Sequence, residues 1–168
     1  MNIPLSKPDL LKALWTSAVA TSAMLWARLP LAAFAGLRVL RLDPSGADVH
    51  LPAGWKTQNP FRSTYFAAQA MAAEMSTGAP ALLFIEETGL KISSLVTGLR
   101  ATFTKKATRD ATFTFDQGAA MKAVIEKAAA SGEGVPFTAR STGRMPDGTI
   151  IAEFEIDWSF KKKASRAD

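Results

Sequence analysis

The chain of 168 residues has no cysteine and a single histidine, His50. The absence of cysteine excludes disulfides, thiolate metal sites and a cysteine nucleophile. A metal site built from several histidines is excluded as well, and a serine–histidine–aspartate triad would have to use His50. A lone histidine in an expected strand is more often structural than catalytic. We predict no metal site and no cofactor.

The sequence also lacks an apolar run long enough to cross a membrane and a glycine-rich loop that could hold phosphates. Its 20 lysines and arginines against 15 aspartates and glutamates give a net charge of +5, which favours anionic partners. Aromatic residues interleaved with these cations on one exposed face are not evident, so we predict no nucleic-acid partner. The length fits one domain, and we expect a cytoplasmic location.

The segment 59–78, NPFRSTYFAAQAMAAEMSTG, predicts the helix around which the rest of the chain is organised. Ser63 is a good N-cap, and Gly78 followed by Pro80 is a good stop. Between these ends the residues are small or apolar on every side, which is typical of a helix inside a core.

Only Gln69 and Glu74 interrupt the apolar part of this helix. At about 100° per residue they lie roughly 140° apart around the axis, so they cannot share one solvated stripe. We therefore expect Glu74 against or inside apolar surroundings, where its pKa is raised. A structural acid paired with an arginine or the backbone is the alternative. We favour a functional acid, because isolated acids on apolar helices are unusual without a role.

A second helix is predicted over residues 6–29, with Ser6 as its cap and an apolar stripe at helical spacing. A secretory signal peptide is disfavoured, because Asp9 lies near the start and Trp26 and Arg28 stand where a cleavage site needs small residues. A membrane-surface helix is disfavoured because the polar face carries few lysines or arginines. The preferred interpretation is an amphipathic helix docked on the domain.

The remaining segments predict a sheet of short-linked strands. Strands are expected at 37–42, 47–51, 92–105, 111–115, 135–144 and 150–160. Turns with proline at the second position and glycine at the fourth follow two of them, at 43–46 and 145–148. Sequential strands joined in this way imply antiparallel pairing.

Three segments allow more specific predictions. In the long strand 92–105, the residues expected on one side are Leu95, Leu99, Ala101 and Phe103. Segment 81–88 is ambiguous between strand and helix, and we favour a short helix. Segment 118–131 predicts an amphipathic surface helix that ends at Gly132.

These elements together predict an architecture. An α+β domain packs its helices on one face of its sheet, and a twisted sheet can wrap a single apolar helix. We therefore predict a hot-dog fold, a curved antiparallel sheet around one long central helix, with an extra N-terminal helix. The expected organisation is a single domain with an N-terminal helical extension at 1–35, a hot-dog core at 36–162 and a tail at 163–168.

Over roughly residues 36–162 the chain resembles the hot-dog thioesterase superfamily, particularly its functionally unassigned thioesterase-like branch. In acyl-CoA thioesterases of this superfamily, an asparagine-led loop opens the central helix and a catalytic acid follows about four turns later. Asn59 matches the loop position, and Glu74, in the string MAAE, matches the acid. The segment LVTGLRATFTKKATRDATFTF resembles the family's central strand, loop and returning strand.

The resemblance implies thioester hydrolysis, with Glu74 activating water or attacking directly and Asn59 orienting the water or the carbonyl. Asn59 is explained equally well as a loop-capping residue. Backbone N–H groups at Ser63 and Thr64, at the expected helix start, would hold the oxyanion. Basic residues standing where family members often bind the nucleotide of CoA are Lys105, Lys106 and Arg109.

Two functional hypotheses follow. The first is an acyl-CoA thioesterase, or an enzyme acting on an acyl-carrier thioester, that works as a homodimer or a dimer of dimers because family active sites generally form between subunits. The alternative is a non-catalytic acyl- or lipid-thioester binding protein of the same fold. It is favoured by residues 62–67, which replace the glycine or His-Gly-Gly of many members. A hydratase-like relative fits less well. Such enzymes usually use an Asp–His pair, and the single histidine, His50 in an early expected strand, fits that pair badly.

Overall fold

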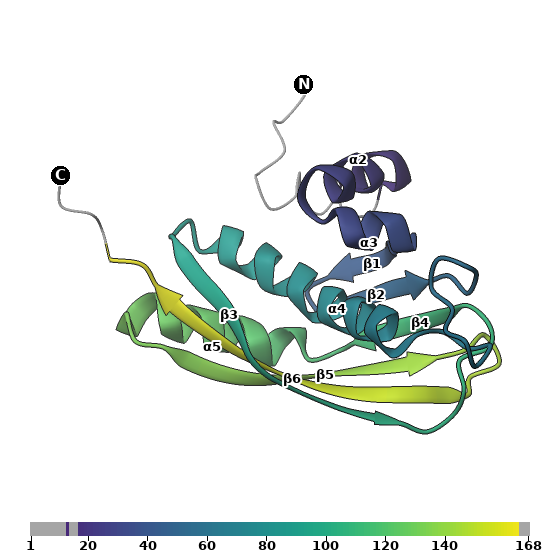
Figure 1. Ribbon diagram of the computed structural model, residues 1–168. Helices are drawn as coiled ribbons and strands as arrows, with labels where there is room; N and C mark the ends of the chain where they lie inside the picture. Colours follow the sequence, from purple (N-terminus) through teal and green to yellow (C-terminus); the bar gives the residue numbers. More distant parts are fainter. Residues whose placement is uncertain (1–12, 14–16, 165–168) are drawn as a thin grey trace.

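The computed structural model describes residue 13 and residues 17–164 (Figure 1). The helices are α2 (Ala18–Arg28), α3 (Pro30–Ala35), α4 (Phe66–Glu87) and α5 (Gly118–Ser131). The strands are β1 (Arg38–Asp43), β2 (Gly46–Leu51), β3 (Ile92–Phe103), β4 (Ala111–Phe115), β5 (Val135–Arg144) and β6 (Ile150–Lys162). Much of the helix predicted over 6–29, and the end of the predicted tail, lie outside the described residues.

All six strands pair antiparallel in one sheet of order β1-β2-β4-β5-β6-β3. Figure 1 shows this sheet curving around α4. The helix α5 packs beside β5 and β6, and α2 and α3 lie near β1. We call the sheet face toward α4 the inner face. On β6 it carries the buried side chains of Phe154, Ile156, Trp158 and Phe160. The predicted α+β hot-dog architecture is confirmed.

Small side chains let α4 lie close to the sheet. Ala72, Ala73, Ser76 and Thr77 are all fully buried. The Ser76 hydroxyl lies 2.8 Å from the Ser141 hydroxyl on β5, so the buried polar atoms of this contact satisfy each other. No helix in the described part of the chain is both long enough and apolar enough to cross a membrane.

Both predicted ends of the central helix are wrong. The helix begins at Phe66, with Tyr65 as its N-cap, and Ser63 does not cap it. Ser63 belongs to the preceding loop, where its N–H donates to the Asn59 Oδ1 atom at 3.3 Å. A short-range turn held by the asparagine side chain therefore competes with helix initiation and delays the start.

The helix also continues through Gly78 and Pro80 to Glu87, so the segment predicted as a separate short helix is its last part. Pro80 leaves the carbonyl of Ser76 without its helical donor. Burial of Pro80 and of the apolar residues after it offsets that loss. An added Cβ at Gly78 would lie 3.1 Å from the Glu74 Oε1 atom, closer than ordinary contact, and 3.6 Å from the Trp158 Cη2 atom, so glycine here leaves room for the carboxylate.

The strand β3 contains a bulge that changes which side chains face inward. Val96 pairs with Trp158 and Gly98 with Asp157, which leaves Thr97 as an extra residue. Leu99 therefore faces inward opposite Ile156 and shares its side with Ala101 and Phe103, as predicted. The prediction for Leu95 is wrong, because it pairs with Ser159 on the outer face, and inward positions before the bulge belong to Ser94 and Val96.

A row of aromatic rings connects the middle of the sheet with the start of α4. Phe113 meets Phe154 with ring centroids 5.9 Å apart, and Phe154 meets Phe103 at 5.6 Å. Phe103 then meets Phe66 at 6.4 Å, and every contact in the row is edge-to-face. The row begins beside Gly143, where an added Cβ would lie 2.6 Å from the Phe113 ring.

We expect Gly143→Ala to destabilise the protein by about 1–3 kcal/mol, because the new methyl group overpacks a fully buried ring. Gly134→Ala is the matched control, since its Cβ would meet only the Ser159 hydroxyl, at 3.6 Å. Denaturant unfolding of both variants measures the difference. Equal stabilities would show that the ring contact at Gly143 relaxes without cost.

Candidate functional site

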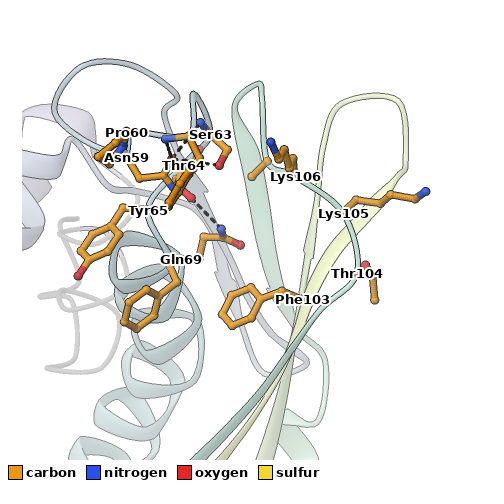
Figure 2. Close-up of a pocket in the computed structure, with 13 residues that line it drawn as sticks. Asn59, Pro60, Ser63, Thr64, Tyr65, Gln69, Phe103, Thr104, Lys105 and Lys106 are labelled. Carbon is orange, nitrogen blue, oxygen red and sulfur yellow. Dashed lines mark hydrogen bonds between the residues drawn. The ribbon is translucent and has the colours of Figure 1, made fainter.

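Two cavities open between β3 and α4. They form because β3 packs mainly on β6 and makes little contact with α4. The larger, of about 590 Å³, lies at the start of α4, and we call it the helix-start cavity (Figure 2). Its lining includes Asn59, Ser63, Thr64, Phe66, Gln69, Phe103, Lys105 and Lys106. The smaller, of about 260 Å³, is the Glu74 cavity, lined among others by Glu74, Gly78, Leu29, Leu82, Ser94 and Trp158.

The structure brings together five of the seven predicted site residues. Those in the helix-start cavity are Asn59, Ser63, Thr64, Lys105 and Lys106. Glu74 lines the other cavity, so one chain does not place it beside Asn59. Arg109 lines neither cavity and pairs with Asp147 on the turn before β6.

Asn59 holds the loop that leads into α4. Its Oδ1 atom accepts hydrogen bonds from the N–H groups of Phe61, at 2.9 Å, and Ser63, at 3.3 Å. The loop-capping role is therefore present. The Nδ2 group donates no hydrogen bond within the described part of the chain, so it remains available to a bound molecule.

The N–H groups predicted for the oxyanion are already engaged. That of Ser63 donates to Asn59, and that of Thr64 donates to the Ala107 carbonyl at 2.8 Å. Because α4 begins at Phe66, its first orphan donors are the N–H groups of Phe66 and Ala67, which have no acceptor among the described residues. Sequence reasoning missed these two donors because it started the helix too early.

Glu74 is half-buried and has neither a hydrogen bond nor an ion pair from its side chain within residues 17–164. Burial raises the pKa of its carboxyl above the ordinary value of 4.5. The neighbouring Trp158 N–H donates to the Thr77 hydroxyl at 3.1 Å, so it does not serve the carboxylate. The cavity thus holds an ionisable group whose charged form nothing in the described chain stabilises.

Gln69 is a cavity residue that sequence reasoning noticed only as a polar interruption. The residue is 4% exposed, and its Nε2 group donates to the Thr64 carbonyl at 3.1 Å. Its Oε1 atom is buried without a partner in the described structure. The signal available in the sequence was its position on an apolar helix, the same signal that selected Glu74.

The single histidine has a structural environment. His50 Nε2 lies 3.5 Å from the Asp110 carboxylate, whose other oxygen accepts the Ala53 N–H at 2.8 Å. Burial lowers the pKa of His50, and the nearby Arg38 lowers it further. No cluster of three or more metal-ligating side chains occurs among the residues that the structure describes.

We expect Glu74→Gln to stabilise the protein at neutral and alkaline pH. A carboxyl with a raised folded-state pKa contributes stability below its unfolded pKa and loses it as the pH rises through the folded pKa. The variant and the wild type should therefore unfold at similar temperatures below about pH 4.5, and the variant should gain an advantage above it. Thermal unfolding across pH measures this, with the exposed Glu86→Gln as control. A pH-independent difference would contradict the assignment.

Solved structures share this fold. The chain is similar to PA5026 from Pseudomonas aeruginosa, a protein of unknown function described as a probable thioesterase, with 20% identity and a TM-score of 0.68 over 97% of this chain and 100% of that one. It is similar to thioesterase HI1161 from Haemophilus influenzae, with 11% identity and a TM-score of 0.62 over 92% and 99%. A thioesterase family protein from Silicibacter pomeroyi is 15% identical, with a TM-score of 0.62 over 88% and 100%.

At these identities the structural likeness shows the fold alone. A search of curated proteins gives no match. The model of a sequence family described as a domain of unknown function, DUF4442, matches residues 17–159. That span contains both cavities. The chain therefore belongs to the DUF4442 family and has the hot-dog fold of proteins named as thioesterases.

Proposed function

We propose that the protein hydrolyses an acyl thioester of coenzyme A or of an acyl carrier protein, with Glu74 as the base and a homodimer as the active form. The observation that carries the proposal is an unpartnered carboxylate in a mainly apolar cavity of the central helix. Such a group is costly to maintain, and its raised pKa makes it a stronger proton acceptor than an ordinary carboxylate. A cytoplasmic location remains part of this proposal.

The reaction needs only water and the thioester. Ionised Glu74 takes a proton from water as the water oxygen bonds to the carbonyl carbon. The carbonyl electrons move to its oxygen, which the N–H groups of Phe66 and Ala67 would hold at the positive end of α4. Collapse then breaks the C–S bond, and the leaving thiolate takes the proton from Glu74. The products are a carboxylic acid and a thiol.

A second copy of the chain would bring these groups together. The strand β3 is an edge of the sheet and exposes Leu95, Val96, Leu99 and Phe103. A long apolar edge of this kind favours pairing with another strand. In an antiparallel pairing of two β3 strands about a two-fold axis near Gly98 and Leu99, Ser94 of one copy lies opposite Phe103 of the other.

That pairing joins the two cavities. Ser94 lines the Glu74 cavity, and Phe103 lines the helix-start cavity. A two-fold dimer would therefore place Glu74 of one copy toward Asn59 and the free helix-start N–H groups of the other. Lys105 and Lys106, at the exposed end of the same cavity, supply positive charge for an anionic carrier.

We expect Leu99→Lys to convert a dimer into monomers, because two like charges would meet near the two-fold axis. Leu40→Lys is the matched control, since Leu40 is an exposed leucine on the opposite edge strand β1. Light scattering on a sizing column measures the mass of each. A monomeric wild type, or a Leu99→Lys variant that keeps the wild-type mass, would contradict the interface.

For activity, we expect Glu74→Gln to lower kcat by roughly a hundredfold or more. The wild type should lose activity as the pH falls through the raised pKa of Glu74, with a midpoint above 4.5, and the variant should lose this acid limb. Thiol release from a panel of acyl-CoA substrates is the readout, and Glu86→Gln is the control.

Each result has a definite meaning. Equal activity of the wild type and Glu74→Gln would remove Glu74 from the mechanism. Binding of acyl-CoA without cleavage by either protein would favour the non-catalytic binding protein instead.

A further inference from the structure

The amide of Gln69 has a fixed orientation in the helix-start cavity. Its Nε2 group lies 3.1 Å from the Thr64 carbonyl oxygen, which can only accept a hydrogen bond. The reverse orientation would set two acceptors against each other. The Oε1 atom therefore points away from Thr64, and Figure 2 shows it directed to the side on which Phe103 lies.

This Oε1 atom is a hydrogen-bond acceptor that lacks a donor in the described structure. It is the one buried side-chain nitrogen or oxygen in the described structure that has no hydrogen-bond partner. Gln69 as a whole is 4% exposed, so bulk solvent has little access to this atom. Leaving a buried carbonyl unpaired costs free energy that a bound donor would recover.

The surroundings indicate what kind of molecule brings that donor. The cavity wall beside Gln69 includes the rings of Phe66 and Phe103, and Lys105 and Lys106 stand at the same cavity with exposed side chains. An elongated ligand with an anionic end and an uncharged N–H group further along matches this arrangement. The phosphopantetheine arm that carries acyl thioesters has this pattern, since pantetheine holds two secondary amides and its 4′-phosphate supplies the anionic end.

We propose that Gln69 Oε1 accepts a hydrogen bond from an amide N–H of the pantetheine arm and so positions the thioester carrier in the helix-start cavity. The identity of the ligand rests on the proposed function, whereas the need for a donor rests on the geometry of Gln69. Coenzyme A and acyl carrier protein share this arm, so either can be the source.

Two partly exposed rings stand beside Gln69 in the cavity lining. Phe66 is 56% exposed and Phe103 is 47% exposed, and they touch each other edge-to-face. Rings so little enclosed can turn aside when a ligand enters, and they then pack on the apolar parts of the arm.

The first experiment is calorimetric titration of pantetheine, pantetheine 4′-phosphate and coenzyme A into the wild type and Gln69→Met. We expect the variant to bind each about tenfold more weakly, as loss of one neutral hydrogen bond predicts. Gln58→Met is the matched control, because Gln58 is exposed and lies outside the helix-start cavity. Unchanged affinity in Gln69→Met, or no binding of any of the three by the wild type, would overturn the inference.

A second experiment needs no variant and so does not depend on the folding of Gln69→Met. Arm analogues with an ester oxygen in place of one or the other amide nitrogen keep the shape and lose the N–H donor. One of them should bind the wild type about tenfold more weakly than the parent arm. Equal binding of both analogues would overturn the inference. If Gln69→Met folds, it should bind the weaker-binding analogue as tightly as the wild type does, because the hydrogen bond is already absent from that complex.

These measurements also separate this inference from the proposed hydrolysis, because they detect binding without turnover. A Gln69-dependent arm site in a protein that cleaves no thioester would support this inference while the hydrolase proposal fails. Comparable affinities for pantetheine 4′-phosphate and coenzyme A support the arm with a protein carrier, and tighter binding of coenzyme A supports the arm with a nucleotide attached.

Discussion

A helix that is apolar on every side has to be covered on every side, and α4 sets this requirement for the whole chain. The sheet meets it by curving, and small residues along α4 let the strands come close. The cover is least complete toward β3, which packs on β6 rather than on the helix. Both cavities lie along that side, so the candidate site is a result of how the helix is wrapped.

The same geometry explains the two polar residues of α4. A glutamate and a glutamine in the middle of an apolar helix conflict with burial, yet each lies where the cover opens into a cavity. Conflicts of this kind between local sequence and global fold concentrate at functional positions. Gln69 and Glu74 therefore belong to one pattern, although they line different cavities of a single chain.

Much of the fold follows from the sequence, because alternation and turn residues act over short distances. The strands at 111–115 and 135–144 and the helix at 118–131 were predicted with the observed limits. The start of α4 was not, because Asn59 holds a turn that local cap preferences do not reveal. Its continuation through Pro80 depends on burial, which outweighs the intrinsic preference of proline.

The candidate site was likewise predictable from the sequence only in part. The choice of Asn59, Glu74 and the two lysines came from residue type and resemblance, and the structure places four of the predicted residues with Asn59 in one cavity. Which N–H groups are free could not be foreseen, because Thr64 pairs with Ala107, far along the chain. The separation of Glu74 from Asn59 likewise depends on long-range packing.

The bulge in β3 has a consequence for comparing related chains. Thr97 is the extra residue of the strand, and the side chains before and after it already face the sides that regular pairing with β6 requires. A relative that lacks this one residue would keep Ser94 and Leu99 on the inner face and have a straighter edge. A one-residue gap at Thr97 is therefore the alignment that conserves the three-dimensional pattern, whereas an ungapped alignment would exchange the inner and outer faces of half the strand.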